Sequence, residues 1–193
     1  IADRTGAGYA VGVSSGTSAL FLSLKALGIG GEVITSPLSF FATPASIATA
    51  GAQPVFADIR DDYNIDPAAI EATITPRTEA IVPVHWSGRP CDMTAIMEIA
   101  RKHGLAVIED AAQAFGSQWE GRHLGTFGNT GAVSFHPLKV LNVTGDAGII
   151  LTNSAQVAER VKRLRNHGCS SRDVCEEWGW NDRMDSVQAT VAL

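Results

Sequence analysis

Strand-like and helix-like segments alternate along almost the whole of this sequence, which leaves few folds open to it. Residues 9–13 form a short apolar run, and residues 17–27 follow with Leu20, Leu24 and Leu27 on one helical face. The same pairing recurs, with strands predicted at 32–36, 53–58, 80–84, 105–109, 131–135 and 147–152 and helices at 41–50, 68–74, 92–103 and 155–166. Because the strands are almost wholly apolar, they are typical of a mostly parallel sheet covered by helices on both faces. The sequence therefore predicts an α/β fold around a seven-stranded sheet.

Two of these helices carry clear start or stop signals. Asp66 and Pro67 predict the start of the helix over 68–74, and Gly104 predicts the end of the helix over 92–103. On a sheet of this kind, ligands bind beyond the carboxyl ends of the strands. We therefore expect the functional residues in the loops that follow residues 13, 36, 84, 109 and 135.

Charge and hydropathy argue against two classes of partner. The net charge is -5 and no basic run stands out, so we expect no nucleic-acid partner. The longest apolar stretches, near residues 80–84 and 148–151, are far too short to cross a membrane, and the first residues lack the order of a signal peptide. Both ends of the sequence look interrupted, so we expect a fragment of a longer protein.

The three cysteines give no sign of a disulfide or metal framework. Cys91, Cys169 and Cys175 are an odd and widely spaced set that fits neither a disulfide pattern nor a zinc pattern. We predict ordinary thiols, no metal site and a reducing, cytoplasmic location.

The first segment with chemical potential is residues 14–20, Ser-Ser-Gly-Thr-Ser-Ala-Leu. A strand ends here and a helix begins, so free N–H groups and the hydroxyls of Thr17 and Ser18 form a ready phosphate site. The alternative is a Ser/Thr helix cap that binds no ligand. The segment is neither a P-loop nor a dinucleotide fingerprint, because the required lysine and glycines are missing.

The second segment brings Asp110 to the carboxyl end of a buried strand. A carboxylate there can hold a heterocyclic nitrogen in its protonated form, which makes the ring an electron sink. Gln113, three residues later, could reach a ring substituent. The alternative is that Asp110 merely caps the next helix.

The third segment is residues 134–139, in which Lys139 follows a strand end. The apolar residues around it would desolvate the ammonium group, which favours imine formation. These residues are Pro137, Leu138, Val140 and Leu141. Most lysines in such loops are simply solvated, so Lys139 alone is weak evidence for a functional site. The combination with the other two segments is more specific. Pyridoxal phosphate (PLP) needs a phosphate anchor, a partner for its pyridine nitrogen and a Schiff-base lysine, and the sequence supplies all three in order.

With these segments the chain resembles the DegT/DnrJ/EryC1/StrS family, the sugar aminotransferases of fold type I among PLP enzymes. The matching stretches are residues 15–20, 109–113, 134–139, 165–168 and 179–184. The resemblance implies that residues 1–193 form the PLP-binding large domain, whose sheet has room for one antiparallel strand. The family's N-terminal segment and C-terminal small domain would lie outside this chain.

The resemblance also assigns residues to the cofactor phosphate. Thr17 and Ser18 would bind it, helped by the hydroxyl of Ser134. Asn181 would reach the phosphate of a neighbouring subunit's cofactor, so a homodimer with shared active sites is implied.

Other residues would hold the cofactor ring. Phe40 would stack on it, with Phe41 as the fallback, while Asp110 would pair with the ring nitrogen and Gln113 with the ring hydroxyl. Lys139 would carry the cofactor and move the proton between substrate and cofactor carbons.

Two histidines remain as weaker candidates. His136 is expected in the substrate pocket, and His85 either lines that pocket or has a purely structural role. Dehydratases of the family carry histidine in place of Lys139, so a lysine there favours transamination.

The implied function is therefore transfer of an amino group from L-glutamate to a keto sugar, either nucleotide-linked or of eight carbons. Such reactions belong to cell-surface polysaccharide or natural-product biosynthesis. A sugar dehydratase and an aminocyclitol or aminohydroxybenzoate synthase of the same family stay open. A catalytically silent regulator with this fold is a further alternative, which the presence of Lys139, Asp110 and Gln113 together disfavours.

Overall fold

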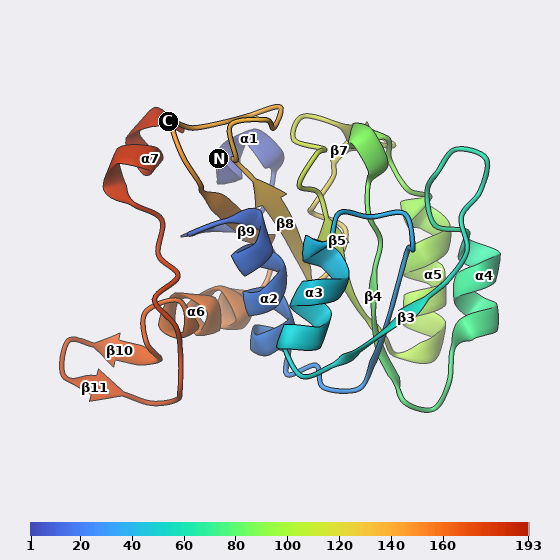
Figure 1. Cartoon of the computed structure of the whole chain (residues 1–193), viewed down its shortest axis with the longest axis horizontal. Coiled ribbons are helices and arrows are strands. Elements are labelled where there is room, and N and C mark those ends of the chain that lie inside the picture. Colours follow the sequence, from blue (N-terminus) through green and yellow to red (C-terminus); the bar gives the residue numbers. More distant parts are fainter. Residues whose placement is uncertain (193) are drawn as a thin grey trace.

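A computed structural model describes residues 1–192, and a seven-stranded sheet forms its centre (Figure 1). Across the sheet the strands are β1 (Tyr9–Val13), β9 (Gly148–Thr152), β8 (Thr130–Ser134), β5 (Ala106–Asp110), β4 (Thr78–Val82), β2 (Glu32–Thr35) and β3 (Gln53–Phe56). Strand β9 runs antiparallel to both β1 and β8, whereas β8, β5, β4, β2 and β3 pair in parallel. The predicted sheet, with its one antiparallel strand, is confirmed.

The apolar side chains of the strands alternate between two hydrophobic cores. In β9, Ile149 and Leu151 belong to one core and Ile150 to the other, because successive side chains of a strand point to opposite faces. One core is covered by α4 (Pro67–Thr73) and α5 (Met93–His103), and the other by α2 (Gly16–Leu27), α3 (Ala42–Thr49) and α6 (Ala155–Leu164). Both faces are therefore buried, which explains the apolar strands.

The helix ends follow the signals in the sequence. The Asp66 carboxylate accepts a hydrogen bond from the Ala68 N–H and Pro67 is the first residue of α4, as predicted. Gly104 ends α5 with a φ of 69°, which costs a glycine little. Ser15 caps α2, and the position of this cap decides where the cavity described below is formed.

Helices α1 (Ala2–Thr5) and α7 (Ser186–Val191) lie near the two ends of the sequence, where its pattern is helical. Three short elements escape the sequence pattern. They are a 3-10 turn at Trp86–Gly88 and two hairpins, β6 (Gln118–Trp119) with β7 (Arg122–His123) and β10 (Cys169–Ser171) with β11 (Val174–Cys175). None of the helices formed by residues 1–192 combines the length and the apolar character needed to cross a bilayer.

The second hairpin overturns the prediction that Cys169 and Cys175 are ordinary thiols. The chain reverses between them, so they lie opposite each other in the β10–β11 register, and their sulfurs form a disulfide. Cys91 is a free, buried thiol. The spacing of the cysteines did not predict this disulfide, because a tight hairpin brings together two cysteines that are six residues apart.

Candidate active site

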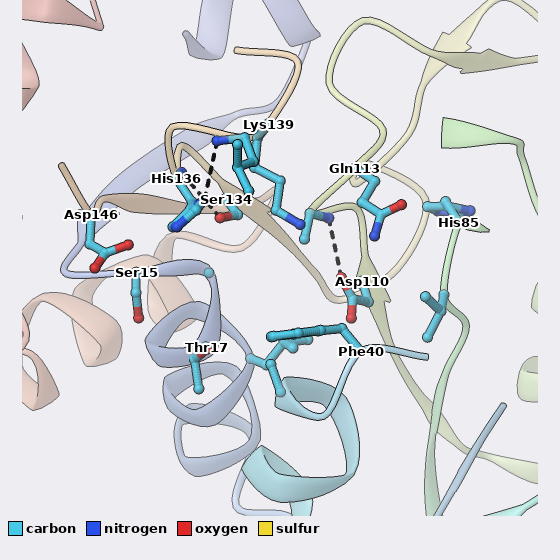
Figure 2. Close-up of a pocket in the computed structure, with 16 residues that line it drawn as sticks. Ser15, Thr17, Phe40, His85, Asp110, Gln113, Ser134, His136, Lys139 and Asp146 are labelled. Carbon is cyan, nitrogen blue, oxygen red and sulfur yellow. Dashed lines mark hydrogen bonds between the residues drawn. The ribbon is translucent and has the colours of Figure 1, made fainter. Parts of the chain in front are cut away.

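A cavity of about 230 Å³ opens at the carboxyl ends of β4, β5 and β8, beside the start of α2 (Figure 2). Most of the predicted site residues line it, namely Thr17, Phe40, His85, Asp110, Gln113, Ser134, His136 and Lys139. They come from five separate segments of the chain, and Figure 2 shows Lys139 extending into the space between Ser134 and Asp110. Ser18, Asn181 and the fallback Phe41 are not among the lining residues.

One end of the cavity is formed by the first turn of α2 and the end of β8. The Ser15 hydroxyl accepts a hydrogen bond from the Ser18 N–H at 3.1 Å, which caps the helix. Gly16 packs so closely on Ser134 that a Cβ on the glycine would lie 2.6 Å from the serine Cβ. This contact holds the Ser134 hydroxyl beside the helix start, where N–H groups and the helix dipole favour an anion.

Ser18 faces away from the cavity because its hydroxyl has protein partners. Its Oγ donates to Asp182 Oδ1 at 2.8 Å and lies 2.8 Å from Ser14 Oγ. Along a helix, Ser18 is turned by about 100° from Thr17, so the two hydroxyls point to different sides of the turn. Ser15, which lines the cavity, stands nearer to an anion bound there.

Asp110 lies on the floor of the cavity with both carboxylate oxygens bonded. Oδ2 accepts from the Thr43 hydroxyl at 2.7 Å, and Oδ1 accepts from the Ala112 N–H at 3.1 Å. Burial raises the pKa of Asp110 above its ordinary value, while the Thr43 and Ala112 hydrogen bonds act in the opposite direction. A cation next to this carboxylate would relieve the cost of burying its charge.

Gln113 is oriented by the backbone of a neighbouring turn. The Ser87 N–H donates to Gln113 Oε1 at 3.0 Å, so the amide presents its Nε2 donor elsewhere. Ser87 and Gly88 both have positive φ, 52° and 82°. A non-glycine residue in this conformation is uncommon, and here it aims the N–H at the glutamine.

His85 both lines the cavity and belongs to a buried polar network. Its Nδ1 accepts from the Cys91 N–H at 3.2 Å, so Nε2 carries the proton that is shared with Glu109 Oε2 at 3.1 Å. Glu109 also accepts backbone N–H groups from Gly125, Phe127 and Gly128. The histidine is therefore fixed in place by groups on the far side of β5.

Lys139 belongs to a turn stabilised by local hydrogen bonds. Its N–H donates to the His136 carbonyl at 2.8 Å, and the Leu138 N–H donates to His136 Nδ1 at 3.1 Å. Of the four apolar residues expected to desolvate the lysine, Leu138 and Val140 do not shield it within residues 1–192, because they are 88% and 72% exposed. Leu141, by contrast, is partly buried and packs against the core.

Asn181 lies apart from the cavity in the segment after the β10–β11 hairpin. It is exposed and forms an isolated bridge with Asn166. Phe41 is also exposed, whereas the neighbouring Phe40 lines the cavity. Between the two phenylalanines, the geometry favours Phe40 for stacking.

Sequence reasoning missed Ser15, Thr43 and Asp146. Ser15 and Asp146 line the cavity, and Thr43 lies behind it on Asp110. Thr43 follows Phe40 by three residues, and this helical spacing was a usable signal. Nothing local to Asp146 marks it out.

Comparison with known proteins places these residues in a family. The sequence profile described as the DegT/DnrJ/EryC1/StrS aminotransferase family matches residues 1–193. The chain belongs to this family. The resemblance expected from the five motifs is thus confirmed, and PLP is the cofactor of the family.

Several relatives align with nearly the whole of this chain. The UDP-N-acetyl-3-dehydro-alpha-D-glucosamine 3-aminotransferase of Acidithiobacillus ferrooxidans is 46% identical over 99% of this chain and 53% of its own length. The dTDP-3-amino-3,4,6-trideoxy-alpha-D-glucose transaminase of Streptomyces venezuelae is 43% identical over 95% of this chain and 49% of its own length. The chain thus spans about half the length of the curated relatives that it matches.

Solved structures agree with the fold of this family member. DesV of S. venezuelae, in complex with a ketimine intermediate, has a TM-score of 0.96 at 42% identity, over 99% of this chain and 52% of that one. NtdA of Bacillus subtilis, with bound cofactor PMP, has a TM-score of 0.94 at 35% identity, over 99% of this chain and 44% of that one. The fold is that of aminotransferases which bind this cofactor.

Proposed function

We propose that this chain is the PLP-binding large domain of an aminotransferase that moves an amino group from L-glutamate to a keto sugar. The observation that carries the proposal is that Lys139, Asp110 and the first turn of α2 line one cavity. A lysine amine, a carboxylate and an anion site would then meet a single small molecule. Each of the three groups could have a purely structural role when taken alone. Three unrelated structural roles would not predict that the groups line the same cavity.

The residues around the cavity fit PLP. The first turn of α2 and the Ser134 hydroxyl suit its phosphate, because N–H donors, hydroxyls and the helix dipole meet there. Phe40 offers an aromatic face to its ring, and the buried Asp110 carboxylate would pair with a protonated ring nitrogen. Gln113, with Oε1 already occupied by Ser87, would donate from Nε2 to the ring hydroxyl.

When bound, PLP supplies a ring that accepts electrons from the substrate carbon next to the transferred nitrogen. Lys139 would hold the cofactor through its amine and, once released, would take up and return the proton at that carbon. Asp110 would keep the ring nitrogen protonated. The turn at residues 136–139 fixes the base of Lys139 by hydrogen bonds while leaving its side chain free to move.

The relatives support a nucleotide-linked acceptor with the keto group at carbon 3. The names of the A. ferrooxidans relative and of a Pseudomonas aeruginosa UDP-2-acetamido-2-deoxy-3-oxo-D-glucuronate aminotransferase, 41% identical, both state that position. An eight-carbon keto sugar is the second class to test. The cavity of about 230 Å³ is smaller than the ~300–1,000 Å³ typical of ligand sites. Its volume suits the cofactor alone, without a nucleotide-linked sugar beside it. Other parts of the assembled protein would form most of the acceptor site.

A second copy of the chain is proposed to complete the site. Leu138, Val140 and Phe41 are exposed apolar side chains, and burying them would favour association. Leu138 lines the cavity, and Val140 and Phe41 directly follow the lining residues Lys139 and Phe40. In such a homodimer Asn181 would contact the phosphate of the partner's cofactor. A homodimer would also supply the desolvation of Lys139 that its own loop does not.

Two alternatives have specific support. A solved 3-amino-5-hydroxybenzoic acid synthase is 31% identical with a TM-score of 0.94, which keeps that chemistry open. A Geobacillus stearothermophilus relative, 45% identical, is named a pleiotropic regulatory protein, which keeps a regulatory role open. A dehydratase is disfavoured because the decisive position is Lys139.

The test is to incubate the intact protein with PLP, ¹⁵N-labelled L-glutamate and a panel of keto acceptors, beginning with nucleotide-linked 3-keto sugars. We expect one acceptor to gain a labelled amine, identified by mass. Transfer to an aminohydroxybenzoate precursor or a cyclitol ketone would select the alternative synthase. Absence of transfer to every acceptor, with cofactor bound, would support a regulator.

A further inference from the structure

The first turn of α3 lies directly against Asp110. The Thr43 hydroxyl donates to Asp110 Oδ2 at 2.7 Å, across 67 residues of sequence. Both residues are withdrawn from water, Thr43 being 1% and Asp110 6% exposed. A hydrogen bond to a buried carboxylate is worth more than one at a surface, because water does not compete for either partner.

The hydrogen bonds of Asp110 suit an ionised carboxylate. Oδ1 accepts from the Ala112 N–H and Oδ2 accepts from Thr43, so both oxygens act as acceptors. An ionised carboxylate has no proton to donate and is satisfied by this arrangement. Thr43 is therefore placed to favour the ionised form, against the burial that disfavours it.

Thr43 also connects Asp110 to the residue proposed to stack on the ring. The Thr43 N–H donates to the Phe40 carbonyl at 3.1 Å, so the two residues belong to one turn. At one end of this turn is the aromatic ring of Phe40, and at the other is the Thr43 hydroxyl that hydrogen-bonds Asp110. The positions of the ring and of its nitrogen partner are thus coupled.

We propose that Thr43 is a positioning residue that keeps Asp110 ionised and aimed at the ring nitrogen of the cofactor. The proposal rests on the proposed PLP site. Four other titratable residues line the same cavity, namely His85, His136, Lys139 and Asp146, and of these His85 and Lys139 favour the charged form of Asp110. A positive charge on His85 or Lys139 would act in the same direction as Thr43, but within residues 1–192 neither side chain hydrogen-bonds the Asp110 carboxylate.

Removing the hydroxyl should change the electronic state of the bound cofactor. Without Thr43 the carboxylate holds more of the proton that it shares with the ring nitrogen. The ring then withdraws fewer electrons from the Lys139 nitrogen joined to it, and that nitrogen keeps its proton to higher pH. The pH midpoint of the visible absorbance should rise by up to about one unit, and kcat should fall about tenfold with KM unchanged.

The test compares Thr43→Val, which keeps the shape, with Thr43→Ser, which keeps the hydroxyl. Thr49→Val, an exposed position on the same helix, is the matched control. We expect the midpoint to rise in Thr43→Val and to match the wild type in Thr43→Ser and Thr49→Val. Thr43→Ala replaces Thr43→Val if melting shows that the valine does not fold.

The outcomes separate two failures. A wild-type protein without any visible cofactor band would overturn the proposed function itself. A wild-type band together with an unchanged midpoint in Thr43→Val or Thr43→Ala would overturn only the role of Thr43. An equal upward shift in Thr43→Ser would also overturn it, because the effect would then come from packing and not from the hydroxyl.

Discussion

Ser18 Oγ lies 2.8 Å from Asp182 Oδ1, although 164 residues separate them in the sequence. The same carboxylate oxygen accepts from Ser14 Oγ at 2.7 Å, and the Ser14 N–H donates to the Asp182 carbonyl. Ser14 and Ser18 flank the turn of Ser15, Gly16 and Thr17 that faces the cavity. The segment after the β10–β11 hairpin therefore supports the proposed phosphate site from behind.

Asp182→Ala should weaken cofactor binding without touching the cavity. The Ser14 and Ser18 hydroxyls, which are partly buried, would lose the carboxylate that accepts their hydrogen bonds. This loss costs about 1–3 kcal/mol and loosens the start of α2. We expect the Kd for PLP, from absorbance titration, to rise about tenfold or more. Asp185→Ala is the control, because the Asp185 side chain makes no capping hydrogen bond. Equal affinities in the two variants would show that the support is not needed.

Gly16→Ala tests the close contact between α2 and β8. The added Cβ would lie 2.6 Å from the Ser134 Cβ, so the helix start or the strand end must move. Overpacking of this kind costs about 1–3 kcal/mol, and the melting temperature and the affinity for PLP should both fall. Gly30→Ala is the control, since its Cβ would meet nothing within 4 Å. A Gly16→Ala protein that melts and binds like the control would contradict the observed packing.

Asp110→Asn should have opposite effects on the empty and the loaded protein. Because burial raises the pKa of Asp110 when folded, its contribution to stability is present below the ordinary pKa of about 3.9 and is lost as pH rises through the raised value. The cofactor-free variant should therefore become more stable than the wild type as pH increases toward neutrality. The affinity for PLP should fall at the same time, because the ring nitrogen loses its anionic partner.

Melting temperatures of the cofactor-free proteins between about pH 4 and 8 test this prediction. Asp61→Asn, at an exposed position, corrects for the general loss of one negative charge. A stability difference between Asp110→Asn and the wild type that does not widen with pH would contradict the prediction.

The sequence was most informative where the chain is buried and regular. The strands were found because a two-sided sheet needs continuous apolar runs such as Gly148–Thr152. The cavity residues Asp110 and Lys139 were found because Asp110 lies at the end of such a strand and Lys139 follows the end of another. Ser134 was found through the family resemblance. The short hairpins were missed because two or three polar residues carry no usable period.

Contacts between distant segments were beyond the reach of local patterns. The rotation of Ser18 away from the cavity depends on Asp182, and the hydrogen bond on Asp110 comes from Thr43. Neither partner is near in sequence. Leu138 and Val140 were expected to desolvate Lys139 because they are apolar and adjacent to it, yet both are exposed. Composition does not indicate whether another chain covers such residues.

The most direct test of the central claim is chemical identification of the lysine that carries the cofactor. The PLP-loaded intact protein is reduced with borohydride and digested, and the peptide that has gained a pyridoxyl group is sequenced by mass spectrometry. Lys25→Ala and Lys139→Ala proteins are treated in parallel. We predict that the group is found on Lys139, that it persists in Lys25→Ala and that it is absent from Lys139→Ala. A pyridoxyl group on a different lysine of the wild type, or an unchanged yield in Lys139→Ala, would contradict the account.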